Sequence, residues 1–200
     1  MKQIILASGS PRRKEILSMF DIPFEIRSSD IEEKVFHGEL PEQVVMALAF
    51  EKGFDIASES DANTIVIAAD TVVYHNVILG KPKNEQEAYD MLKELSATEH
   101  YVYTGIAVIE SCSDFKIVDY VKTKVVFKEL SDETINTYIA SGEVWGKAGA
   151  YAIQGLGSTL VKYIEGDFYN VVGLPISRLQ DILVQHFNMS LMKGIKVDDV

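Results

Sequence analysis

Cysteine and histidine are scarce in this chain of 200 residues, which has one cysteine, Cys112, and four histidines. A single cysteine excludes an intrachain disulfide and a zinc site made of cysteines. The histidines lack metal-ligand spacing, and a surface position is expected for each of them: His37, His75, His100 and His186. There is also no Cys/His pair for covalent catalysis, so any chemistry must depend on other side chains.

The chain also lacks long apolar runs and a positive net charge. Its formal net charge of −11 disfavours non-specific binding to nucleic acid or to an anionic membrane. The first apolar run, residues 4–7, is too short for a secretion signal, and no run approaches the length of a membrane span. These features predict a reducing, cytoplasmic location. Against this acidic background, a locally basic segment is informative.

The hydrophobic pattern predicts an α/β fold with a mixed, twisted sheet, flanking helices and two lobes around a central cleft. Apolar runs and alternation predict strands near residues 3–7, 24–27, 64–69, 74–79, 100–110, 115–128 and 159–164. Helical spacing predicts helices that open near residues 10, 41, 84, 131 and 175. We expect residues 1–188 to form a single domain and residues 189–200 to form a flexible tail.

The segment LASGSPRRKEIL, residues 6–17, places two arginines at the start of a predicted helix. Ser10 is the expected cap, and Pro11 is the first helical residue. The first turn of a helix already carries partial positive charge and unpaired N–H groups. Arg12 and Arg13 therefore cost stability there unless an anion binds, and the segment predicts an anion site.

Asp70 directly follows the continuous apolar run 64–69. A carboxylate at the end of a buried strand is costly unless it meets a cation, a metal or a hydrogen-bond donor. In open α/β sheets, ligands bind where strands end. Asp70 is therefore a candidate functional residue, although this residue alone is equally well interpreted as the cap of a turn in DTVV.

Further cations are expected to lie near these residues. Lys52 falls on the apolar stripe of its predicted helix, and Lys81 follows a hairpin in LGKP. Each lysine alone is more often a solvated surface residue. Together with Ser8, the arginines and the carboxylates, they suit a polyphosphate with a bridging metal. The P-loop pattern is missing, because LGKP lacks the glycine-rich lead and the following Ser or Thr.

Five segments carry a resemblance to a known family: LASGSPRRKEIL, AADTVV, LGKP, KAGAYAIQG and GDFYNVVGLP. In this order and at this spacing, they resemble the Maf family of nucleoside triphosphate pyrophosphatases, over residues 3–187. The resemblance implies a mixed α/β fold with a central cleft, similar to inosine triphosphatase. It also implies hydrolysis of a nucleoside triphosphate to the monophosphate and pyrophosphate with a divalent cation, Mg or Mn.

The resemblance also implies roles for individual residues. Asp70 matches the proton acceptor, and Glu33 and Asp70 are the expected metal ligands. The matching residues that handle phosphate or metal are Ser8, Arg13, Glu33, Lys52 and Lys81. The positions tied to base preference are Arg12, Thr71 and Gln154. Thr71 and the YAIQG loop resemble the subgroup that acts on dTTP and UTP, with 7-methyl-GTP as the alternative substrate.

The residue types agree with a uracil or thymine base. The amide of Gln154 can pair with N3–H and one carbonyl of such a base, and the hydroxyl of Thr71 is expected to reach the same cleft because it follows Asp70. The alternative is that Gln154 only braces the glycine-rich loop. A second class of function is a non-catalytic nucleotide-binding regulator of septum formation. The expected partner is a nucleoside triphosphate, with no nucleic acid or membrane, and a homodimer is compatible with the sequence.

Overall fold

A computed structural model describes residues 2–33 and 38–192, and these form a seven-stranded mixed sheet. Its strands are β1 (Gln3–Ala7), β2 (Glu25–Arg27), β3 (Thr64–His75), β4 (Val77–Leu79), β5 (Glu99–Glu110), β6 (Lys116–Phe127) and β7 (Val161–Glu165). The order is β2-β1-β3-β5-β6-β7, with β4 paired to β3. Strand β1 is parallel to β2 and β3, whereas the other pairs are antiparallel. The predicted mixed α/β sheet is confirmed.

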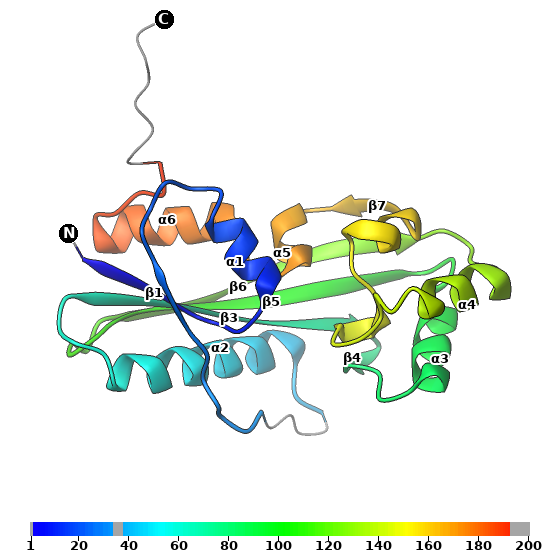
Figure 1. Ribbon diagram of the computed structural model, residues 1–200, viewed down its shortest axis with the longest axis horizontal. Helices are drawn as coiled ribbons and strands as arrows, with labels where there is room; N and C mark the ends of the chain where they lie inside the picture. The colour runs from blue at the N-terminus through cyan, green and yellow to red at the C-terminus, as the bar shows by residue number, and fades with distance from the viewer. Residues whose placement is uncertain (1, 34–37, 193–200) are drawn as a thin grey trace, which may run out of the picture.

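Helices cover both faces of this sheet (Figure 1). They are α1 (Pro11–Leu17), α2 (Pro41–Ser58), α3 (Glu85–Leu95), α4 (Asp132–Ala140), α5 (Phe168–Val172) and α6 (Ile176–Phe187), with short 3₁₀ helices η1 (Ala148–Ala150) and η2 (Gly155–Thr159). Helix α2 lies along one face, and α1, α5 and α6 lie on the other. The sequence did not predict α5, which is too short to show a helical period. Strand β7 begins two residues later than predicted because η2 occupies residues 155–159.

Alternation along β3 separates the core into layers. Val66 and Ala68 pack beneath α2, whereas Ile65, Ile67 and Ala69 pack toward α1 and α6. A further core cluster at the other end of the sheet joins α3 and α4 to the distal parts of β3, β5 and β6. The long strands therefore run through both lobes and connect them (Figure 1).

On one edge, β3 pairs first with β1 and then with β4, and a gap in the pairing separates these two strands. Strand β1 pairs with β3 only as far as Ala68, and β4 pairs with β3 only from Val73. On its other edge, β3 pairs continuously with β5 from Ile65 to Tyr74. Within the described residues, no strand pairs with residues 69–72 on the interrupted edge. The prediction that the strand ends at Asp70 is wrong, because the pairing with β5 carries β3 past this residue.

A glycine beside Asp70 lets α2 approach the sheet closely. Gly105 on β5 is in register with Asp70, and a Cβ atom at Gly105 would lie 2.1 Å from the backbone oxygen of Val45 on α2. No side chain can be accommodated at that distance without a shift of the helix. Because glycine has no side chain, Gly105 permits this close approach of α2 to the sheet.

The segment after α6 folds back onto the helix. Leu191 is buried, and its backbone N–H donates to the side-chain oxygen of Gln180 at 2.8 Å. The start of the predicted tail therefore packs, while residues 193–200 lie outside the described residues. Among the described helices, none is long and apolar enough to span a bilayer.

We expect Gly105→Ala to destabilise the protein by about 3 kcal/mol, the upper part of the usual range for overpacking a core. The cause is the collision of the new methyl group with the backbone of α2. Gly80→Ala is the matched control, because a Cβ atom there would meet nothing within 4 Å. Urea unfolding measures both variants, and an equal, small effect of the two would contradict this account of the α2 packing.

Candidate active site

A cavity of about 680 Å³ opens at the interrupted edge of β3. Its walls come from the β1–α1 connection, the segment after β2, helix α2, the β3–β4 hairpin, and the segments 146–148 and 171–173. The predicted site residues that line it are Ser8, Arg12, Arg13, Glu33, Lys52, Asp70, Thr71 and Lys81. The structure thus brings together residues that are far apart in the sequence.

Asp70 and Thr71 reach this cavity from opposite faces of the sheet. Successive side chains of a strand alternate, so Asp70 lies on the face covered by α2 and Thr71 lies on the face of α1 and α5. Both line the cavity because it lies at the edge of β3 and extends to both faces. Thr71 therefore lines the cavity, as predicted. Its position next to Asp70 in the sequence is not the reason, because adjacent residues of a strand point to opposite faces of the sheet.

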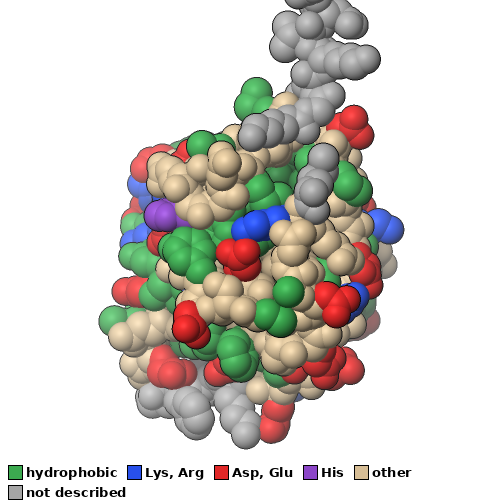
Figure 2. Space-filling view, turned by 90° about the vertical axis from the view of Figure 1, so that its left-hand side faces the viewer, with side chains coloured by type: hydrophobic (Ala, Val, Ile, Leu, Met, Phe, Trp, Pro, Cys, Tyr) green, Lys and Arg blue, Asp and Glu red, His purple; other side chains and the backbone are tan. Residues whose placement is uncertain are grey.

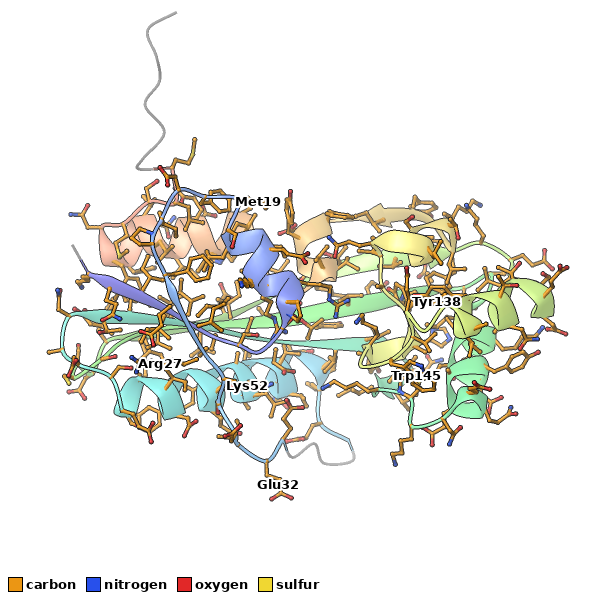
Figure 3. The ribbon with its side chains drawn as sticks, in the orientation of Figure 1. Met19, Arg27, Glu32, Lys52, Tyr138 and Trp145 are labelled. Carbon is orange, nitrogen blue, oxygen red and sulfur yellow. The ribbon has the colours of Figure 1, made fainter. Side chains whose placement is uncertain are left out.

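On the α2 face, Lys52 joins two carboxylates. Its Nζ atom lies 2.5 Å from Oδ1 of Asp70 and 2.6 Å from Oε1 of Glu33. Figure 3 shows Lys52 on α2, beside the segment that follows β2. The hydrogen bond from Lys52 holds the pKa of the Glu33 carboxyl below its usual value, despite the opposing effect of burial. The group is therefore a compact ion triad, and Asp70 itself is buried.

On the other face, Arg13 is held by three acceptors. Its Nε donates to the backbone oxygen of Gly173 at 2.7 Å, Nη1 donates to Oγ of Ser8 at 3.2 Å, and Nη2 donates to Oγ1 of Thr71 at 3.1 Å. Burial lowers the pKa of the Arg13 guanidinium, and the nearby carboxylate of Asp70 opposes this shift. An arginine in a protein keeps its charge even so. Arg13 is therefore a fixed cation within the cavity wall.

Arg12 and Lys147 add positive charge to the same cavity. Burial lowers the pKa of Arg12, and burial together with the charge of Arg12 lowers the pKa of Lys147. Sequence reasoning missed Lys147, although it is the first residue of the KAGAYAIQG segment. Trp145, two residues before Lys147 in the chain, is exposed (Figure 3).

Gln154 is not brought together with the other candidates. Its side chain is exposed, and it is not among the described residues that line the cavity. It lies just before η2 and makes no side-chain cap there. The acidic side chain that binds this loop is Glu143, which accepts from the backbone N–H groups of Leu156 at 3.0 Å and Gly157 at 3.2 Å.

The predicted surface position is wrong for His100, whose exposure is 0%. It lies on β5, where Nε2 is 2.7 Å from the hydroxyl of Tyr151, and its ring packs edge-on against Phe127 and Tyr151. Tyr151 also lines the cavity. Burial lowers the pKa of His100 to about 3. His186 is exposed as predicted, His75 is partly buried, and His37 lies outside the described residues.

The buried His100 predicts a pH dependence of stability. Its pKa is lowered on folding, so the unfolded chain binds a proton that the folded protein does not bind between pH 6.5 and about 3. The free energy of unfolding should therefore fall as the pH falls through this range, by about 2 kcal/mol from this group between pH 7 and pH 5.

His100→Gln retains a polar side chain without this titration, so its stability should change less over the same interval. Urea unfolding at several pH values measures the difference. His186→Gln is the control, because His186 is exposed and should leave the pH dependence unchanged. If His100→Gln and the unaltered protein lose equal stability between pH 7 and pH 5, the buried neutral histidine is not the cause.

A mixed α/β fold whose cavity joins fixed cations to paired carboxylates defines a protein suited to a polyanionic ligand. Comparison with known proteins agrees with this class. The family model for Maf-like proteins matches residues 3–186, so the chain belongs to the Maf-like family.

Relatives match over nearly the whole length. A dTTP/UTP pyrophosphatase of Clostridioides difficile (strain 630) is 50% identical over 192 residues, which cover 96% of this chain and 99% of that protein. A dTTP/UTP pyrophosphatase of Caldanaerobacter subterraneus is 52% identical over 199 residues, covering 98% of this chain and 96% of that protein. Among solved structures, a HAM1 protein from Coxiella burnetii aligns with a TM-score of 0.48 and 16% identity, over 64% of this chain and 73% of that one.

Proposed function

We propose that this protein hydrolyses nucleoside triphosphates, with dTTP and UTP as its substrates, to the nucleoside monophosphate and pyrophosphate. The observation that carries the proposal is that one cavity of an acidic chain joins Asp70 to five basic residues: Arg12, Arg13, Lys52, Lys81 and Lys147. The names of the relatives support the substrate class. In Figure 2 acidic side chains are spread over the visible face, as expected for a chain with a net charge of −11.

Each group in the cavity has a role in the proposed reaction. Asp70 orients the attacking water and accepts its proton, and Lys52 holds this carboxylate in place. Arg13, Lys81 and Lys147 bind the phosphate oxygens, where fixed cations stabilise the charge that develops on the leaving pyrophosphate. Arg13 suits this role because its guanidinium is already oriented by three acceptors.

A divalent cation, Mg or Mn, fits the carboxylates of Glu33 and Asp70. One oxygen of each lies 2.6 Å or less from the same lysine nitrogen, so both can converge on a single cation. No group of three or more acidic, histidine or cysteine side chains suited to a metal occurs in residues 2–33 and 38–192. Two carboxylates, completed by substrate phosphates and water, are typical of Mg²⁺. When bound, such an ion would withdraw charge from the phosphate oxygens.

Base selection is assigned to the part of the cavity near Arg12 and Thr71. The hydroxyl oxygen of Thr71 can accept from N3–H of uracil or thymine, and the guanidinium of Arg12 can donate to a carbonyl group of the base. The side chain of Gln154 is exposed outside the cavity and does not cap η2, so base selection is not proposed for this residue. The alternatives remain hydrolysis of 7-methyl-GTP and nucleotide binding without turnover. We also infer that residues 1–188 belong to one domain, onto which Leu191 also packs. The single cysteine supports a cytoplasmic location.

We expect Asp70→Asn to lower turnover by ~10²–10⁴-fold, the usual cost of losing a general base, without loss of the fold. The matched control is Asp132→Asn, because Asp132 also pairs with a lysine, Lys93 at 2.7 Å, but lies on α4 outside the cavity. Pyrophosphate release measures turnover, and circular dichroism checks the fold. A folded Asp70→Asn variant with nearly full activity would remove Asp70 from the mechanism.

A panel of UTP, dTTP, CTP, GTP and 7-methyl-GTP, assayed for pyrophosphate release with Mg²⁺, tests the function itself. We expect the highest kcat/KM for UTP and dTTP. Cytosine should be disfavoured because its amino group would face donors of the cavity, at a cost of ~1–3 kcal/mol.

A guanine nucleotide that leads by roughly tenfold, equivalent to about 1.4 kcal/mol in transition-state binding, would contradict the base assignment. Saturable nucleotide binding with no pyrophosphate release from any member of the panel would favour the non-catalytic regulator. A matched assay in EDTA tests the dependence on a divalent cation.

A further inference from the structure

A buried threonine outside the cavity contacts the residues that hold Arg13. Thr104 on β5 is in register with Thr71 on β3, and its exposure is 0%. Its Oγ1 atom lies 2.9 Å from Oγ1 of Thr71 and donates to the backbone oxygen of Asn170 at 2.9 Å. Thr104 is not among the described residues that line the cavity. It therefore contacts the site only through other residues.

The hydrogen bonds run from Arg13 through Thr71 and Thr104 to the carbonyl of Asn170, and the groups at the two ends of this chain determine the direction of each bond. Arg13 can only donate, and the carbonyl of Asn170 can only accept. Each threonine hydroxyl has a single hydrogen, so Thr71 must accept from Arg13 and donate to Thr104, which in turn donates to the carbonyl. The hydroxyl of Thr71 is thus held as an acceptor toward Arg13.

Thr104 also reaches Arg13 by a second route, through α5. Asn170 lies within α5 and is completely buried, and its Nδ2 donates to the oxygen of Val102 at 3.0 Å and to Oγ1 of Thr123 at 2.9 Å. Gly173, at the end of this helix, supplies the 2.7 Å acceptor for Nε of Arg13. Thr104 therefore contacts both Thr71 and α5, which carry two of the three acceptors of Arg13.

We propose that Thr104 is a positioning residue for Arg13, which fixes the orientation of the guanidinium through Thr71 and α5 so that its remaining N–H groups are available to a polyphosphate. A guanidinium has five N–H donors, and the three bonds described use one on each nitrogen. Two donors, one on each terminal nitrogen, remain for a ligand. This proposal rests on the proposed function only for the identity of that ligand.

The test is a double-mutant cycle of Thr104→Val and Arg13→Ala, with the affinity for inorganic tripolyphosphate measured by calorimetry. Valine has the shape of threonine without the hydroxyl. We expect Thr104→Val to weaken binding about tenfold in the otherwise unaltered protein but less than twofold when Arg13 is already alanine. The same pattern is expected in KM for UTP. Equal losses in both backgrounds would overturn the proposal.

Two further variants separate positioning from general stability. Thr104→Ser restores the hydroxyl and should recover binding to within about twofold of the unaltered protein. Thr64→Val is the control, because Thr64 is also a buried threonine but lies at the start of β3 and does not line the cavity. The positioning role of Thr104 would also be overturned if Thr104→Ser bound tripolyphosphate as weakly as Thr104→Val, or if Thr64→Val bound it equally weakly. Thr104→Ala replaces Thr104→Val in the cycle if the valine variant does not fold.

Tripolyphosphate binding does not require turnover, so the cycle distinguishes the two proposals. A protein that binds tripolyphosphate with the expected coupling, but releases no pyrophosphate from any nucleotide, contradicts the proposed function and supports the role of Thr104. A protein that hydrolyses UTP and shows no coupling supports the function and overturns the role of Thr104. Absence of tripolyphosphate binding to the unaltered protein also overturns it.

Discussion

The interruption on one edge of β3 is the constraint on which the site depends. Strand β1 ends its pairing at Ala68 and β4 begins at Val73, so four residues of a buried strand have no strand on that side within the described residues. Continuous pairing with β5 keeps these residues extended. A strand edge exposes the side chains of both faces to the same space, which is why Asp70 and Thr71 line one cavity. A regular sheet would have separated them.

The charges in the cavity are stabilised differently on the two faces. On the α2 face, one lysine pairs with two carboxylates at short distance, which offsets part of the cost of placing Asp70 in a buried position. That geometry requires α2 to approach the sheet, and Gly105 permits it. On the opposite face, Arg13 is surrounded by neutral oxygens that supply partial charge but do not neutralise it. The first group retains one net negative charge, which suits a cation, whereas the second retains a positive charge that attracts an anion.

Much of this arrangement follows from the sequence, because periodicity reports which face of an element is buried. The predicted strands, the helices that begin at Pro11 and Pro41, and the inward position of Lys52 are present. Periodicity does not report which strands pair, so the apolar run 64–69 predicts a strand that ends before Asp70, whereas pairing with β5 extends this strand. The scattered spacing of the histidines predicts a surface position for each of them, and this spacing does not report that His100 lies on a buried face of β5.

Residues whose role depends on loops or on register were the least predictable. Lys147 lines the cavity and Gln154 does not, although both belong to one glycine-rich stretch, and nothing in their spacing separates them. The contact between Thr71 and Thr104 depends on a register that only the folded sheet defines. Helix α5 is too short to have a recognisable pattern, yet it supplies two of the acceptors in this network.

The two adjacent arginines of α1 have different environments, and this difference explains why both occur at a helix start. Arg13 extends across to Thr71 and Gly173, so it links α1 to β3 and α5 as well as contributing charge. Arg12 makes no such link among the described residues, and burial in the cavity wall dominates its pKa. Buried polar groups that cross-link elements can often be replaced by apolar ones with little loss of stability. Fold stability alone therefore does not account for a chain of two threonine hydroxyls behind Arg13. Orientation of a cation toward a ligand does account for it, because an apolar core would leave the guanidinium free to rotate.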